Sequence, residues 1–204
     1  MAACPRCQQL ATLDSAQGYC ALHHALWQLE RARAVAWARW VLASPHVRIL
    51  DTETTGLDGT AEVVELSVVS AQGTILFDSL IRPQAPIPAA ATAIHSLDDR
   101  AVAHAPTLAQ VYERLVALLA GQIVVVYNAA FDRRVLQQSG ARWRLPALRP
   151  VAWHCAMQEY ARFSGAWNAE KGAYRWHKLE GGDHSALGDC WATWTLIRAM
   201  AEEG

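Results

Sequence analysis

Three runs rich in β-branched and other aliphatic residues constrain the fold of this chain most. The runs lie at residues 47–50, 62–69 and 74–81, and the segments between them contain Gly59 and Gly73. Side chains of this kind favour extended strands, and short glycine-containing connections favour antiparallel neighbours. The sequence therefore predicts an antiparallel meander of three strands.

Helix-like and strand-like segments alternate after the meander. Thr107 and Gln110 have the spacing of a helix-capping pair, and Gly121 and Gly140 are expected to stop two helices. The expected segments are a loop at 82–88, a helix from 107, a buried strand at 123–126, a helix at 131–139, a strand at 151–153 and helices ending near 163 and spanning 185–201. This order predicts an α/β domain with a mixed sheet.

The segment before the meander has a different pattern. Apolar residues recur at three- and four-residue steps over residues 21–43, which predicts a long helix, and Pro45 ends the pattern. We therefore expect two parts: an appendage at residues 1–45 and a main domain at residues 46–204.

Cysteines in the appendage have metal-ligand spacing. Cys4 and Cys7 are followed, after twelve residues, by Cys20 and His23. This Cys-x₂-Cys and Cys-x₂-His set predicts a zinc knuckle with one structural zinc ion, in which His23 or its neighbour His24 supplies the fourth ligand. The alternative is a disordered tail with incidental cysteines. Such a knuckle has three possible roles: binding substrate, binding a partner, or bracing the helix.

The rest of the composition bears on location and partners. No apolar run approaches the roughly 20 residues needed to cross a bilayer, and the N-terminus lacks the layout of a secretory signal. We expect a cytoplasmic protein without a membrane partner. Acidic residues dominate 51–132 while both flanks are mildly basic, a pattern that fits either an ion-binding centre with a basic rim or ordinary surface scatter.

Acidic residues occur where the expected strands and helices meet. Asp51 and Glu53 end the first strand two positions apart, so both carboxylates point to one face and favour a hard cation such as Mg²⁺ or Mn²⁺. Asp132 falls in the first turn of a helix, and His184 and Asp189 flank the start of the last helix. Taken singly, each has an ordinary structural reading at a strand end or a helix start.

Together these residues form three ordered motifs. They are D-x-E-T-x-G at 51–56, N-x-x-F-D at 128–132 and H-x-A-x-x-D at 184–189. In this order and spacing, over about residues 46–201, the chain resembles the DEDDh 3′→5′ exonucleases of the RNase H-like superfamily. That family includes RNase T and the proofreading epsilon subunit of bacterial DNA polymerase III.

The resemblance implies a fold, an activity and a ligand set. The implied fold is RNase H-like, with a mixed five-stranded sheet flanked by helices. The implied reaction is hydrolysis from the 3′ end to nucleoside 5′-monophosphates by a two-metal mechanism, with His184 as general base. Two Mg²⁺ or Mn²⁺ ions would be held by Asp51, Glu53, Asp132 and Asp189, and Thr54, Leu57, Asn128 and Phe131 would contact the substrate.

Substrate and partners are less constrained. We expect nucleic acid with single-stranded 3′ ends, DNA in preference to RNA, a role in DNA repair, and a polymerase or another protein as a possible partner. Aromatic and basic residues interleave at 167–178, which fits either a nucleic-acid-binding loop or a loop packed on the domain. The alternative function is a catalytically silent module that binds nucleic acid or protein through the zinc knuckle.

Overall fold

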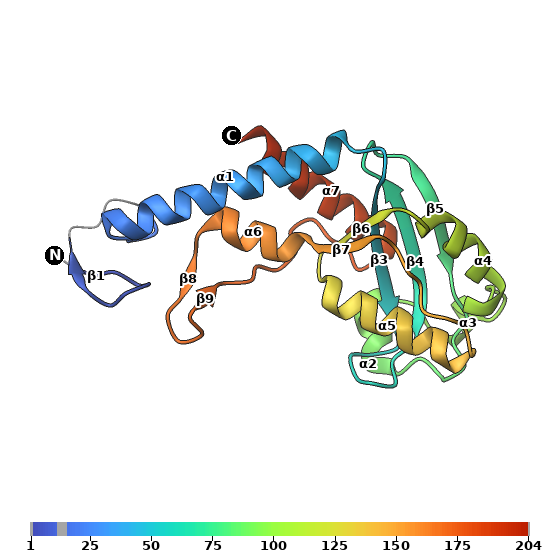
Figure 1. Cartoon of the computed structure of the whole chain (residues 1–204). Coiled ribbons are helices and arrows are strands. Elements are labelled where there is room, and N and C mark those ends of the chain that lie inside the picture. The colour runs from blue at the N-terminus through green and yellow to red at the C-terminus, as the bar shows by residue number, and fades with distance from the viewer. Residues whose placement is uncertain (1, 12–15, 204) are drawn as a thin grey trace.

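A mixed five-stranded sheet lies at the centre of the main part of the molecule (Figure 1). The computed structural model describes residues 2–11 and 16–203. The strands are β3 (Val47–Thr54), β4 (Val63–Ser70), β5 (Ile75–Leu80), β6 (Ile123–Val126) and β7 (Ala152–Cys155), in the order β5-β4-β3-β6-β7. β3, β4 and β5 are antiparallel neighbours, whereas β6 and β7 run parallel to β3. The predicted meander and mixed sheet are confirmed.

Helices cover both faces of this sheet. Leu50 of β3 belongs to a buried cluster with residues of α4 (Leu108–Leu119) and α5 (Ala129–Arg142). Its neighbour Ile49 belongs to the opposite cluster, which α1 (Ala21–Ala43), α6 (Ala156–Ser164) and α7 (Ala186–Glu202) complete. Since successive strand residues point to opposite faces, the apolar run of β3 supplies both cores.

The long helix α1 extends beyond the sheet (Figure 1). One side of its C-terminal half packs against α6 and α7, and its first turns lie beside the short strands β1 (Ala2–Ala3) and β2 (Leu10–Ala11). A second hairpin, β8 (Trp167–Asn168) and β9 (Ala173–Tyr174), lies on the same side. Across the described residues, no helix combines the length and apolarity that a membrane crossing requires.

One local prediction was wrong, and two short helices lie where none was predicted. Gly140 does not stop α5, which continues to Arg142; a glycine inside a helix costs only about 1 kcal/mol, and the Gly140 carbonyl accepts a hydrogen bond from the Leu145 amide. Two short helices, α2 (Ala89–His95) and α3 (Asp99–Val102), follow the proline-studded loop and were not predicted. The Asp98 carboxylate caps α3 by accepting a hydrogen bond from the Ala101 amide.

Candidate active site

β3 continues past its apolar run and carries two of the predicted acids. Asp51 and Glu53 lie on the same face as Ile49, toward α7, because they are two and four residues further along the strand. Thr52 points to the opposite face, where its hydroxyl donates a hydrogen bond of 2.8 Å to Asp132 Oδ1. The strand therefore presents two carboxylates directly and orients a third.

Asp132 and Asp189 come from the first turns of two helices. β6 runs parallel to β3, so the ends of both strands lie at one edge of the sheet, and α5 begins there with the buried Asp132. α7 packs across β3 and β4 and brings Asp189 to the same edge. A carboxylate in the first turn of a helix is favoured by the positive end of the helix dipole.

The turn before α7 holds His184 in an unusual backbone conformation. His184 has φ of 60°, in the left-handed region that residues with side chains seldom adopt. The amides of Asp183 and His184 donate hydrogen bonds of 3.1 and 3.3 Å to Asp189 Oδ1. A β-carbon at Gly182 would overlap the same carboxylate oxygen, so the approach depends on glycine. The turn thus fixes Asp189 and His184 together.

A fifth carboxylate, Glu65 of β4, was missed in the sequence. It lies opposite Glu53 in the antiparallel register, and its Oε2 accepts a hydrogen bond of 2.8 Å from the Ala186 amide at the start of α7. Burial raises its pKa. The available signal was a single acid inside a largely aliphatic strand, which is costly unless it has a partner.

The predicted acids converge on one cavity. Asp51, Glu53, Asp132 and Asp189 line a hollow of about 170 Å³, and no lysine or arginine is among the described residues that line it. His184 lies at its side, since one ligand atom each of His184, Glu53 and Asp189 fall within 4.8 Å of one another. The structure therefore brings together all five residues of the predicted catalytic set.

The electrostatics of this cavity favour a cation. Because burial disfavours their charged forms and Asp189 lies nearby, the pKa of Glu53 rises to about 8 and that of Asp132 to about 7. Burial, followed by the charges of Asp132 and Asp189, raises the pKa of Asp51 well above its ordinary value. Burial also raises the pKa of Asp189. Clustered carboxylate oxygens that repel one another are a donor set suited to Mg²⁺ or Mn²⁺.

The four predicted substrate residues lie in different places. Asn128 and Phe131 line the cavity beside the acids. Thr54 is buried, and its hydroxyl donates a hydrogen bond of 2.8 Å to the Gly56 carbonyl. Leu57 is 80% exposed and is not part of the cavity lining.

The residues of the predicted zinc knuckle also lie together. Single ligand atoms of Cys4, Cys7, Cys20 and His23 all fall within 4.8 Å of one another. The alternative ligand His24 instead has its ring beside Trp27, with 5.6 Å between ring centroids.

The 167–178 segment has features of both predicted readings. Trp167 and Tyr174 pack against the N-terminal segment, as a packed loop would, whereas Trp176 is 68% exposed, as a nucleic-acid-binding loop allows.

Sequence comparisons identify relatives that cover most of the chain. The RNase T family of exonucleases matches residues 49–197. An uncharacterized exonuclease, CP81, of Escherichia phage 186 is 37% identical over 171 residues, which are 76% of this chain and 88% of the phage protein. Exodeoxyribonuclease 10 of Escherichia coli K12 is 31% identical over 159 residues, which are 74% of this chain and 66% of that protein.

Solved structures with the same fold include nucleases bound to ligands. Exonuclease X in complex with 5′ overhanging duplex DNA aligns with a TM-score of 0.57 and 29% identity, over 78% of this chain and 92% of that chain. The nuclease domain of 3′hExo, a DEDDh family member bound to rAMP, aligns with a TM-score of 0.62 over 79% of this chain and 94% of its own. At 17% identity, that second likeness concerns the fold alone.

Proposed function

The chain belongs to the RNase T family of exonucleases, and on that premise we propose that it hydrolyses nucleic acid from the 3′ end and releases nucleoside 5′-monophosphates. The observation that carries the proposal is the convergence of Asp51, Glu53, Asp132 and Asp189 with His184 around one cavity. These residues come from three separate segments of the chain, and an inactive binding module would have no need to keep such a costly set of partly buried acids together.

The four acids would hold two divalent ions, Mg²⁺ or Mn²⁺. When bound, such ions supply charge stabilisation for the attacking and leaving oxygens of the phosphodiester. The surrounding chain keeps the ligand oxygens in place, because the Thr52 hydroxyl fixes Asp132 and the two amides of the turn before α7 fix Asp189. Outer contacts of this kind orient carboxylate ligands.

His184 is the proposed general base. It lies close to Glu53 and Asp189, which line the cavity, and histidine exchanges protons readily near neutral pH. The left-handed backbone and the hydrogen bonds from its own turn to Asp189 limit the directions its ring can take. Its proposed role is to accept the proton of that water as it attacks the terminal phosphodiester.

DNA is the proposed substrate in preference to RNA. Support comes from the relative named Exodeoxyribonuclease 10 and from the solved complex of exonuclease X with duplex DNA. Asn128 and Phe131 line the cavity beside the acids and would contact the terminal nucleotide. Single-stranded 3′ ends, a role in DNA repair and association with a polymerase remain predictions.

The test is degradation of 5′-labelled oligonucleotides with Mg²⁺ or Mn²⁺. Single-stranded DNA, its RNA counterpart and a duplex with a 5′ overhang would be compared. We expect a ladder that shortens from the 3′ end, fastest on DNA. Asp51→Asn should abolish it, because a carboxylate that faces the cavity is lost, and His184→Ala should slow it by about 10²–10⁴-fold. The exposed His104→Ala is the matched control and should cut normally.

Each other outcome has a definite meaning. Shortening from the 5′ end would overturn the polarity, and faster loss of RNA would reverse the substrate preference. Cleavage that survives Asp51→Asn would point to a contaminating nuclease. If no substrate is cut while the protein binds oligonucleotides, the chain would be a catalytically silent binding module.

A further inference from the structure

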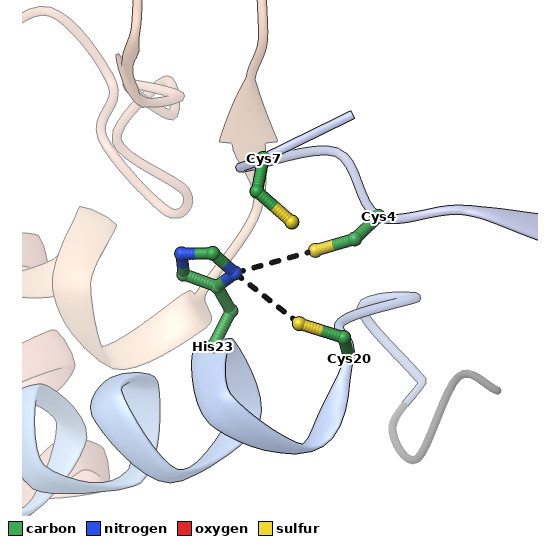
Figure 2. A group of neighbouring side chains, drawn as sticks. All are labelled: Cys4, Cys7, Cys20 and His23. Atoms are coloured by element: carbon green, nitrogen blue, oxygen red, sulfur yellow. Dashed lines mark hydrogen bonds between the residues drawn. The ribbon is translucent and has the colours of Figure 1, made fainter. Parts of the chain in front are cut away.

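The N-terminal cysteines and His23 have the arrangement of a tetrahedral metal site (Figure 2). His23 Nδ1 lies 3.6 Å from Cys4 Sγ and 3.3 Å from Cys20 Sγ, and the Cys7 thiol points into the same space. Zinc bonds of about 2.3 Å to sulfur and about 2.0–2.1 Å to nitrogen give a tetrahedron whose sulfur–nitrogen edge is about 3.6 Å. The two distances therefore already match such a site closely.

Local structure presents these four ligands in pairs. The segment from Cys4 to Cys7 is a tight turn, closed by hydrogen bonds from the Gln8 amide to the Cys4 carbonyl and from the Cys4 amide to the Gln9 carbonyl. Cys20 precedes α1 and His23 lies in its first turn, so both side chains face the turn. Three sulfurs and one imidazole nitrogen are ligands that select zinc.

Arg6 projects from between the first two cysteines onto the β8–β9 hairpin. Its guanidinium carbon lies 4.5 Å from the ring centre of Trp167 and 5.3 Å from that of Tyr174. Its Nη1 donates hydrogen bonds of 2.9 Å to the Tyr174 hydroxyl and 3.2 Å to Glu30 Oε2. The Tyr174 hydroxyl also donates to Glu30 of α1. Arg6 thus connects the cysteine turn, the hairpin and the helix.

The chain that leaves this hairpin leads to the candidate active site. Tyr19 precedes Cys20 in the sequence, and its hydroxyl donates a hydrogen bond to the carbonyl of Gly165, just before the hairpin. Past the hairpin, the Tyr127 hydroxyl donates a hydrogen bond of 2.7 Å to the His177 carbonyl, and Leu179 lines the acidic cavity. Five residues after Leu179 the chain reaches His184. The position of the hairpin therefore affects the position of the segment that ends at His184.

We propose that Cys4, Cys7, Cys20 and His23 bind one zinc ion, and that this zinc site positions the 167–174 hairpin through Arg6. Zinc closes the cysteine turn onto the start of α1 and thereby fixes the backbone from which Arg6 projects. The cluster contains few buried apolar side chains, chiefly Tyr19 and Trp27, so a metal ion would supply much of its stability. The zinc site is separate from the acidic cavity and does not depend on the proposed hydrolysis.

The first experiment measures the metal. The full chain would carry Asp51→Asn to weaken ion binding at the acidic cavity, and elemental analysis should find one zinc per chain. Cys20→Ser should lose that zinc, and Cys155→Ser, a cysteine outside the cluster, should retain it. Cobalt substitution should give the intense visible absorption of thiolate ligands in the parent and Cys155→Ser alone. A chain that neither contains zinc nor takes it up, or equal zinc in Cys20→Ser, would overturn the proposal.

The second experiment measures the hairpin. Hydrogen exchange of residues 166–178 should speed up by about 10-fold or more in Arg6→Ala, because charge-assisted hydrogen bonds are lost, while the zinc content stays unchanged. Arg33→Ala, an exposed arginine on α1, is the matched control and should leave exchange unchanged. Cys20→Ser should loosen the same peptide and leave the central strand β6 protected. Normal hairpin exchange in Arg6→Ala would show that Arg6 does not position the hairpin.

Discussion

Glu65 occupies a position from which one carboxylate meets two parts of the candidate active site. It lies beside Glu53 across the β3–β4 ladder, and it accepts the Ala186 amide at the start of α7. The amides of a helix's first turn lack partners within the helix, so an acid there both satisfies a donor and benefits from the helix dipole. Glu65 therefore couples the strand that carries two acids to the helix that carries Asp189.

Replacing Glu65 tests this coupling. Glu65→Ala removes the acceptor and should lower kcat by about 10–100-fold with little change in KM, because the start of α7 loses its attachment to β4. Glu65→Gln keeps an acceptor oxygen and should restore most of the rate. Steady-state kinetics on a DNA oligonucleotide, with melting temperatures alongside, provide the measurement. Equal losses in both variants would mean that the charge matters rather than the hydrogen bond.

For single residues, sequence patterns located the four acids but not the contacts that hold them in place. Asp51 and Glu53 are two residues apart on one strand, and Asp132 and Asp189 each stand in a recognisable motif. Glu65 bonds to a residue 121 positions away, and no local periodicity reports such a pairing. The left-handed conformation of His184 is likewise set by its turn and not by a turn-forming residue at that position.

At the scale of elements, the turn that leads into α7 carries His184 into the candidate active site. Asp183 Oδ1 accepts both the amide and the hydroxyl of Ser185, and the Ser185 hydroxyl in turn accepts the Gly188 amide as the helix cap. A β-carbon at Gly188 would overlap Asp183 Oδ1 and crowd the Ser185 hydroxyl. The helix cap at Ser185 and the turn that presents His184 therefore both depend on the absence of a side chain at Gly188.

Gly188→Ala should consequently impair catalysis more than stability. Overpacking costs about 1–3 kcal/mol, and the higher helix propensity of alanine returns about 1 kcal/mol, so a net cost of about 0–2 kcal/mol should lower the melting temperature by no more than about 8 °C. The displaced turn should reduce kcat by about 10-fold or more, since misplaced catalytic groups lose rate steeply. Gly59→Ala, in a turn with open space around it, is the matched control. Wild-type kcat in Gly188→Ala would show that the turn tolerates displacement.

Elements with strong local signals were predicted well, and those held by distant contacts were not. The Thr107–Gln110 capping box opens α4 as expected, and the three-stranded meander pairs as expected. Gly140 gave a misleading stop signal, because the adjoining chain returns to bond its carbonyl. The β8–β9 hairpin has too few residues to show a strand pattern, and Arg6 packs on it from the other end of the sequence.

For the whole molecule, the acidic cavity is a source of instability that a divalent ion should relieve. Glu53 and Asp132 have pKa values of about 8 and about 7 in the folded chain, above the ordinary values near 4 that the unfolded chain has. Between those limits the folded state binds more protons than the unfolded state. Without a bound ion, the free energy of unfolding contributed by these groups must therefore fall as pH rises from about 4 to about 8.

Urea unfolding checks this with Asp132→Asn, which keeps an oxygen able to accept the Thr52 hydroxyl. Without added Mg²⁺ or Mn²⁺, the variant should become more stable relative to the wild-type chain between about pH 5 and about pH 8. Mg²⁺ near pH 8 should reverse the order, since an ion at 100 times its Kd stabilises by about 2.7 kcal/mol. A stability difference that does not vary with pH or Mg²⁺ would argue against a shared ion site.

The packing of α1 on α7 also joins two segments that are made far apart in time during synthesis. Ala38 and Val41 of α1 share a buried cluster with Ile197 and Met200 of α7, and Arg31 bonds to Glu203, 172 residues later. A nascent chain emerging from the ribosome thus exposes one apolar face of α1 until α7 follows. Asp189 arrives with α7 and His184 just before it. The buried contact between α1 and α7 and the candidate active site therefore depend on the same segment, and neither can form before α7 has been made.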